Sequence, residues 1–172
     1  DFKQNSKLIV VGSSWPKDEE LFMNLINQRL TNDWKIVFAP HNLNDGEINS
    51  FLSKINQKAV KFSDLEKLSQ QDLIDSKIFI LNTIGILSKV YSYADITYIG
   101  GGFGAGIHNT LEAVTFGTPV VFGPKYKKFQ EAVDLIEVGG GFSIANQTEF
   151  DTIMNRLMND ENFRKESGKK AG

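Results

Sequence analysis

The chain alternates two patterns of apolar residues. Short runs that are apolar at nearly every position are separated by longer segments in which apolar residues recur every three to four positions. Lys7–Ser14 is such a run, and Pro16–Leu30 opens with a proline and three acidic residues, as helices do. Strands that are apolar on both faces and alternate with helices predict an α/β fold, with a parallel sheet covered by helices on both faces.

The same alternation predicts the remaining elements. Further strands are expected at Trp34–Pro40, Ala59–Phe62, Lys77–Asn82, Asp95–Gly100, Pro119–Gly123 and Gly141–Ile144. Further helices are expected at Gly46–Ile55, Gly85–Ala94, Asn109–Gly117 and Phe129–Gly139, and two closing helices over about 148–172 are expected to be capped at Thr148 and Asp160. With 41% hydrophobic residues in 172, we expect a single domain over 1–172.

Composition argues against several classes of function. The net charge of −2, with acids and lysines interspersed, gives no basic field for nucleic acid. The chain has no cysteine and only His41 and His108 as histidines, so we expect no metal cofactor. It has no apolar run of about 20 residues and no signal-peptide pattern at its start, so we expect a soluble domain.

A glycine-rich run follows the expected strand Asp95–Gly100. Five of the chain's 15 glycines lie in GGGFGAG, at 100–106. In open parallel sheets ligands bind where strands end and helices begin, and the amide groups there suit phosphate. We therefore expect these glycines to bring the backbone close to a ligand. The spacing Gly100-x-Gly102-x-x-Ala105 is like a dinucleotide fingerprint, but that motif belongs after the first strand, where this chain has GSSW, so NAD is disfavoured.

The stretch 81–144 carries a family resemblance. It contains GIL-x-x-x-Y-x-x-AD, the glycine-rich loop, HN-x-LE, G-x-PV-x-FGP and F-x-E, with weaker echoes in GSSW and PHN. Together these motifs resemble the carboxyl-terminal, donor-binding domain of 3-deoxy-D-manno-octulosonic acid (Kdo) transferases. Those enzymes are GT-B glycosyltransferases of lipopolysaccharide biosynthesis, built from two Rossmann-like halves.

The resemblance implies a function shared with a missing partner domain. The donor would be CMP-Kdo, and the acceptor would be lipid A precursor at the cytoplasmic face of the bacterial inner membrane, where the full-length enzyme associates peripherally. The family's catalytic carboxylate lies in the amino-terminal acceptor domain, which is absent from this chain, so we expect donor binding without catalysis. Transfer would be an inverting displacement with CMP leaving, its phosphate met by amide groups around Gly106 to Thr110 and not by a metal.

Each site residue also has a structural interpretation. Glu112 is predicted to bind the ribose, yet with Asn109 it has the spacing of a capping box. His108 is either a donor contact or a packed loop histidine, and Ser13 either faces the donor or, like Ser14, caps the helix at Pro16. The candidate donor-binding residues are Ser13, Gly85, Ile86, Leu87, Gly101, Gly102, Gly104, Gly106, His108, Asn109, Thr110, Glu112, Lys127, Phe129 and Glu131.

One departure from the family keeps alternatives open. The family often carries an arginine near the PHN motif, where this chain has His41 and Asn42 instead, so either these substitute or the contact is missing. Lys125, Lys127 and Lys128 form either a solvated cluster or a cation site for the donor. The alternatives to a Kdo transferase are the donor half of a UDP-sugar transferase or epimerase, and a Rossmann-like module without enzymatic function.

Overall fold

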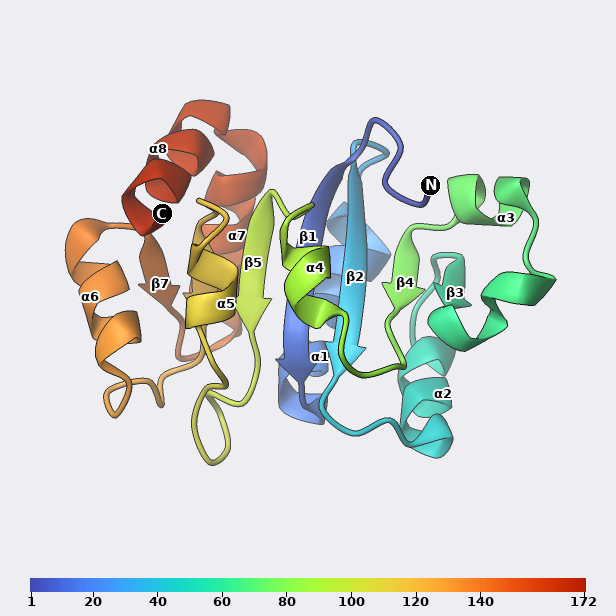
Figure 1. Ribbon diagram of the computed structural model, residues 1–172, viewed down its shortest axis with the longest axis horizontal. Helices are drawn as coiled ribbons and strands as arrows, with labels where there is room; N and C mark the ends of the chain where they lie inside the picture. Colours follow the sequence, from blue (N-terminus) through green and yellow to red (C-terminus); the bar gives the residue numbers. More distant parts are fainter.

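The molecule is built on one seven-stranded parallel sheet (Figure 1). The computed structural model describes residues 1–172, apart from the side chain of Leu111. The strand order is β3-β4-β2-β1-β5-β6-β7. The strands are β1 (Lys7–Ser14), β2 (Trp34–Pro40), β3 (Ala59–Lys61), β4 (Ile78–Ile80), β5 (Ile96–Ile99), β6 (Val120–Phe122) and β7 (Gly141–Ser143). The prediction of a parallel sheet is confirmed.

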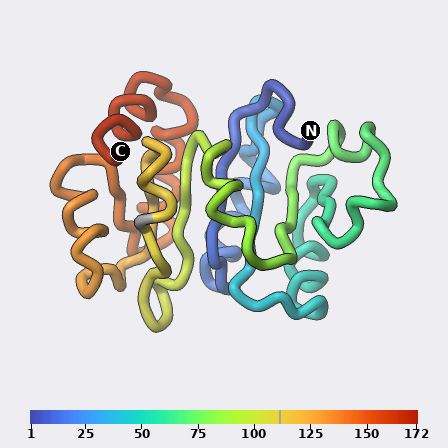
Figure 2. Tube along the Cα trace, viewed as in Figure 1, coloured from blue at the N-terminus to red at the C-terminus, as the bar shows by residue number. Residues whose placement is uncertain are grey.

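The order in which strands are added to the sheet reverses at β1. Strand β1 pairs with β2 on one side and with β5 on the other, so that Val11 lies opposite both Phe38 and Tyr98. The chain before β5 fills one half of the domain and the chain after it fills the other half (Figure 2). Connections therefore leave β1 and β5 in opposite directions, which opens a crevice at their carboxyl ends.

Helices cover both faces of the sheet (Figure 1). Ile9 and Val11 of β1 share one core cluster with residues of α1, α2 and α7, whereas Leu8 and Val10 face the opposite cluster, which includes residues of α4, α5 and α6. The helices are α1 (Pro16–Asn24), its π-helical continuation η1 (Leu25–Arg29), α2 (Asp45–Ser53), the 3₁₀ helix η2 (Phe62–Lys67), α3 (Gln70–Asp75), α4 (Leu87–Tyr91), α5 (Leu111–Val114), α6 (Gln130–Val138), α7 (Gln147–Asn159) and α8 (Glu161–Ala171).

Several boundaries differ from the sequence prediction. The apolar pattern missed η2 and α3, although Ser69 and Asp72 form a capping box at the start of α3. The cap of α7 is Asn146, whose side chain accepts from the Glu149 amide at 2.9 Å, so the prediction of Thr148 was wrong. The predicted cap of α8 at Asp160 is confirmed.

Two predicted helices at the crevice are shorter than expected. The segment expected as Gly85–Ala94 is helical only over Leu87–Tyr91, and that expected as Asn109–Gly117 only over Leu111–Val114. Thr110 is the N-cap of α5, which puts Glu112 at the second helical position and not the third. The predicted Asn109–Glu112 capping box was therefore wrong.

Candidate functional site

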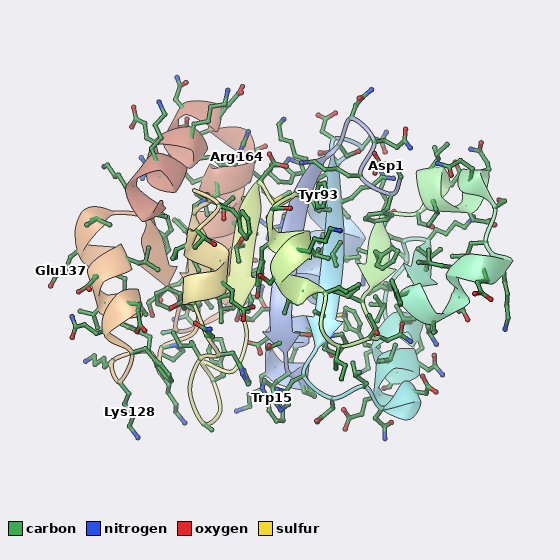
Figure 3. The ribbon with its side chains drawn as sticks, in the orientation of Figure 1. Asp1, Trp15, Tyr93, Lys128, Glu137 and Arg164 are labelled. Atoms are coloured by element: carbon green, nitrogen blue, oxygen red, sulfur yellow. The ribbon has the colours of Figure 1, made fainter. Side chains whose placement is uncertain are left out.

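Several loops meet at the carboxyl end of the sheet. The loop after β1 carries Trp15, the loop after β2 carries His41, and the glycine-rich loop of residues 100–110 follows β5. The loop after β6 carries Lys128, which lies at the same end of the molecule as Trp15 (Figure 3). This is the position at which ligands bind in open α/β sheets.

A buried carboxylate joins the first of these loops to the glycine-rich loop. Asp18, on the first turn of α1, is 1% exposed. Its Oδ2 accepts from the backbone amides of Trp15 at 2.9 Å and Gly101 at 3.1 Å, and its Oδ1 accepts from the Tyr98 hydroxyl at 2.7 Å. Burial, with the Asp18 charge as a further cause, raises the pKa of the Tyr98 phenol. A carboxylate is tolerated in the interior only when it accepts hydrogen bonds in this way.

Sequence reasoning missed Asp18. It was interpreted only as one of the acidic residues that favour a helix start. The signal that could have found it is its position three residues after Trp15, which is the spacing of a capping box, although tryptophan is a poor N-cap residue. Trp15 is the N-cap in the structure, so the predicted capping by Ser13 or Ser14 was wrong. Ser14 instead donates to Glu19 Oε1 at 3.0 Å.

The glycine-rich loop folds tightly on itself and on its neighbours. Gly106 has a φ of +134°, and a side chain at Gly100 would overlap the Ser13 carbonyl oxygen. At Gly104, by contrast, an added Cβ would meet nothing closer than the Gly101 oxygen at 3.8 Å. A Cβ atom at Gly101 would overlap the Gly106 oxygen, and one at Gly102 would overlap the Gly123 backbone. The loop's own conformation and packing thus account for glycine at four of the five positions, where close approach to a ligand had been the expected reason.

The loop after β6 is fastened to the glycine-rich loop. The Lys125 amide donates to the Gly102 oxygen at 2.9 Å, and its Nζ donates to the Gly104 oxygen at 2.7 Å. The Phe129 ring would lie 3.4 Å from a Cβ atom at Gly106. The structure thereby brings the loop that carries Phe129 to the candidate site, with Lys127 exposed in that loop and Glu131 half-buried in the first turn of α6.

The two histidines of the chain meet at the same edge. The Trp15 and His41 rings stack at 4.2 Å between centroids, and the His41 and His108 rings lie 4.7 Å apart. Partial burial, followed by the proximity of His41, lowers the pKa of His108, and the Asp18 charge opposes this shift. His108 is half-buried, and the pair presents imidazole groups at the crevice.

Glu112 lies beside a buried tyrosine. Its side chain is exposed on α5, and its charge adds to burial in raising the pKa of Tyr91 of α4. The Tyr91 hydroxyl occupies the space over Gly12 of β1, where any Cβ atom would overlap it. The Glu112 carboxylate itself is open to solvent, as a ligand-binding carboxylate has to be.

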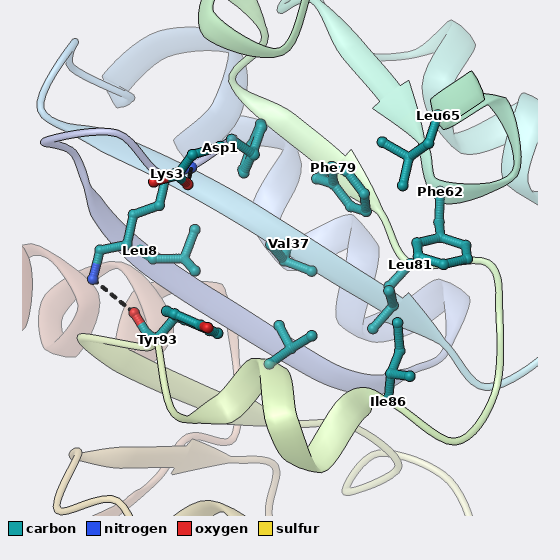
Figure 4. Close-up of a pocket in the computed structure, with 12 residues that line it drawn as sticks. Asp1, Lys3, Leu8, Val37, Phe62, Leu65, Phe79, Leu81, Ile86 and Tyr93 are labelled. Carbon is teal, nitrogen blue, oxygen red and sulfur yellow. Dashed lines mark hydrogen bonds between the residues drawn. The ribbon is translucent and has the colours of Figure 1, made fainter. Parts of the chain in front are cut away.

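The loop after β4 opens onto an apolar cavity of about 390 Å³ (Figure 4). Ile86 lines one end of this cavity, and Lys3 lies at the other end, where its Nζ donates to the Tyr93 oxygen at 2.7 Å. Gly85 has a φ of +90°, and Leu87 begins α4. Helix α4 contacts both β1 and α5, which brings this loop's helix back toward the glycine-rich loop.

The described residues contain neither a metal-binding cluster nor a membrane-spanning helix. No three His, Cys, Asp or Glu residues among the described residues gather closely enough to bind a metal ion. In the same residues, no helix combines the length and apolar character needed to cross a membrane.

Comparison with known proteins shows which proteins the chain is similar to. No protein-family model matches it. It is 32% identical over 142 residues to the 3-deoxy-D-manno-octulosonic acid transferase of Chlamydophila psittaci, which covers 80% of this chain and 31% of that protein. The chain is a relative of the Kdo transferases. The Aquifex aeolicus Kdo transferase is 27% identical over 160 residues, covering 91% of this chain and 43% of that enzyme.

A solved structure bears out the fold. The crystal structure of the carboxyl-terminal CMP-Kdo binding domain of WaaA from Acinetobacter baumannii superposes with a TM-score of 0.79 at 19% identity, covering 99% of this chain and 89% of that one. The predicted carboxyl-terminal, Rossmann-like fold of a GT-B glycosyltransferase is confirmed. The chain spans 31% to 43% of the length of the two Kdo transferases above, so it corresponds to one part of such enzymes.

Proposed function

We propose that this chain is the donor-binding domain of a Kdo transferase and that it binds CMP-Kdo in the crevice at the carboxyl ends of β1 and β5. The observation that carries the proposal is that the Kdo transferases match over 80% to 91% of the chain. The structure with a TM-score of 0.79, which spans nearly the whole chain, is also named as a CMP-Kdo binding domain.

The phosphate contacts that we propose differ from those expected from the sequence. The amides of Gly106, Ile107 and His108 already donate to backbone oxygens of Gly101, Lys125 and Gly100, respectively. Helix α5 has only four residues, so its dipole adds little. We therefore assign the phosphate to the imidazoles of His108 and His41, beside Thr110, with Glu112 accepting hydrogen bonds from the ribose hydroxyls.

The remaining donor contacts come from the flanking loops. The backbone of Gly85, Ile86 and Leu87 would contact the cytosine, since Ile86 directs its side chain into the apolar cavity. Lys127 is exposed beside the glycine-rich loop and is available to the Kdo carboxylate. His41 and Asn42 stand where the family's arginine is expected.

The domain has a limited part in the reaction. The acceptor hydroxyl attacks the anomeric carbon of Kdo and gives its proton to the catalytic carboxylate, the bond from that carbon to the phosphate oxygen breaks, and CMP leaves with the bonding electrons. This chain holds CMP and donates hydrogen bonds to the departing phosphate, which lowers the barrier by electrostatic stabilisation. We assign the catalytic carboxylate and the lipid A precursor site to the part of Kdo transferases that this chain does not match. The isolated chain is then inactive, and the full-length enzyme acts at the cytoplasmic face of the inner membrane.

Calorimetric titration of the chain with CMP and, separately, with UDP tests the proposal. We expect CMP to bind at least about tenfold more tightly, equivalent to about 1.4 kcal/mol. Tighter binding of UDP would assign the chain to UDP-sugar enzymes, and binding of neither nucleotide would favour a non-enzymatic module. Either result overturns the proposal.

A further inference from the structure

The Asp18 carboxylate binds Gly101, the residue to which several other residues of the glycine-rich loop are hydrogen-bonded. Its Oδ2 accepts from the Gly101 amide, and the Gly101 oxygen in turn accepts from the amides of Gly104 at 3.0 Å and Gly106 at 3.1 Å. The preceding Gly100 oxygen accepts from the His108 amide at 3.2 Å. A shift of Gly101 would therefore be passed through the loop as far as the proposed phosphate contacts.

Asp18 is itself held in place by a hydrogen bond from Tyr98. The Tyr98 hydroxyl donates to Oδ1 at 2.7 Å, and both residues are inaccessible, with exposures of 0% for Tyr98 and 1% for Asp18. A Cβ atom at Gly100 would lie 2.9 Å from Oδ2, so the carboxylate fits at this place because residue 100 is glycine. Neither side chain can touch a ligand in the crevice, and any effect on binding has to act through the loop.

We propose that the buried Tyr98–Asp18 pair is a positioning relay that fixes the glycine-rich loop in its ligand-binding conformation. Its consequence for CMP rests on the proposed function. A buried carboxylate that loses a hydrogen-bond donor shifts or takes up water, because leaving it unsatisfied is costly. Weakening the bond from Tyr98 is thus expected to release Gly101, and with it Gly104, Gly106 and the backbone at residue 108.

The test compares two substitutions on adjacent residues of β5. Tyr98→Phe removes only the hydroxyl that holds Asp18. Thr97→Val is the matched control, because Thr97 Oγ1 makes a buried hydrogen bond of 3.0 Å to Thr118 Oγ1, away from the glycine-rich loop. Both variants lose one buried side-chain hydrogen bond, so a purely structural role for Tyr98 predicts that they behave alike.

The first measurement needs no ligand. We expect amide hydrogen exchange at Gly104 and Gly106 to be about tenfold faster in Tyr98→Phe than in Thr97→Val, the size of effect given by one hydrogen bond. The Val121 amide in β6 serves as the internal reference and is expected to respond equally in both variants. Equal exchange at the two glycines in both variants would overturn the relay, whatever the chain binds.

The second measurement is CMP affinity at a temperature at which each variant is folded by circular dichroism. Tyr98→Phe and Asp18→Ala are expected to bind about tenfold more weakly, whereas Asp18→Asn retains an oxygen for the two amides and should recover to within about threefold of the unmodified chain. Unchanged affinity in Tyr98→Phe would overturn the relay. Failure of the unmodified chain to bind CMP would instead overturn the proposed function, and the exchange measurement would still decide on the relay.

Discussion

Single substitutions in the glycine-rich loop test which glycines are needed for the backbone conformation of the loop. Gly106 has a φ of +134°, a conformation that L residues rarely adopt, whereas the backbone at Gly104 is not in the left-handed region and an added Cβ there would only touch the Gly101 oxygen at 3.8 Å. Gly106→Ala is expected to cost about 1–3 kcal/mol of unfolding free energy, the strain of a non-glycine residue in a sparsely populated region. Gly104→Ala is expected to leave stability unchanged or raise it by up to about 1 kcal/mol, because the unfolded chain loses freedom.

The two substitutions therefore predict opposite shifts of the melting temperature. For a chain of this length, each 1 kcal/mol corresponds to about 2–4 °C, so Gly106→Ala should melt about 2–16 °C lower than Gly104→Ala. A domain with about 5–15 kcal/mol of stability tolerates this loss and stays folded at room temperature. Urea unfolding of both variants checks the free energies. Equal stability of the two variants would refute the argument that the loop's own conformation requires glycine at 106.

Four further predictions concern single side chains. Glu112→Gln is expected to lower CMP affinity about ten- to a hundredfold, as loss of charge-assisted hydrogen bonds to the ribose does, while the melting temperature stays unchanged because Glu112 is exposed; equal affinity would exclude the ribose role. Because the folded-state pKa of His108 is lowered, its neutral form favours folding above pH about 6.5, and stability should fall as the pH drops below that value, a loss that His108→Asn removes. His41→Asn should raise the pKa of His108, measured by NMR titration of the imidazole proton, and a fall would contradict the pairing. Asn146→Ala should lower the free energy of unfolding, measured in urea, by about 0.5–2 kcal/mol, whereas Thr148→Ala should leave it almost unchanged. The reverse order would show that Thr148 is the cap.

The strands could be predicted because burial on both faces leaves a strong local signal. Lys7–Ser14 and Trp34–Pro40 have the same bounds in the structure as in the prediction, since each is a mostly apolar run that ends at small or turn residues. Helix ends were harder, because they depend on where backbone amides find other partners. Helix α5 begins two residues late, in a segment where the amides of Ile107 and His108 already donate to backbone oxygens outside the helix.

The position of the candidate loops was predictable, but the contacts among them were not. The glycine run and HN-x-LE were expected to follow a strand at the carboxyl end of the sheet, and the structure places them after β5 at that end. Asp18 could not be found in this way, since its partners Tyr98 and Gly101 lie 80 and 83 residues away along the chain. Likewise, nothing in the spacing of His41 and His108 indicates that their rings meet. Such contacts arise only when the sheet order brings the ends of β1, β2 and β5 together.

The placement of the two tryptophans gives the domain separate optical reporters. Trp15 is 37% exposed and stacks on His41 at the crevice, so its emission should respond to any molecule that enters between the loops. Trp34 is 3% exposed, with Lys7 and Arg164 near its ring, and should change only when the core opens. Fluorescence of a Trp34→Phe variant would then follow occupancy of the crevice, and that of a Trp15→Phe variant would follow unfolding, without an added dye.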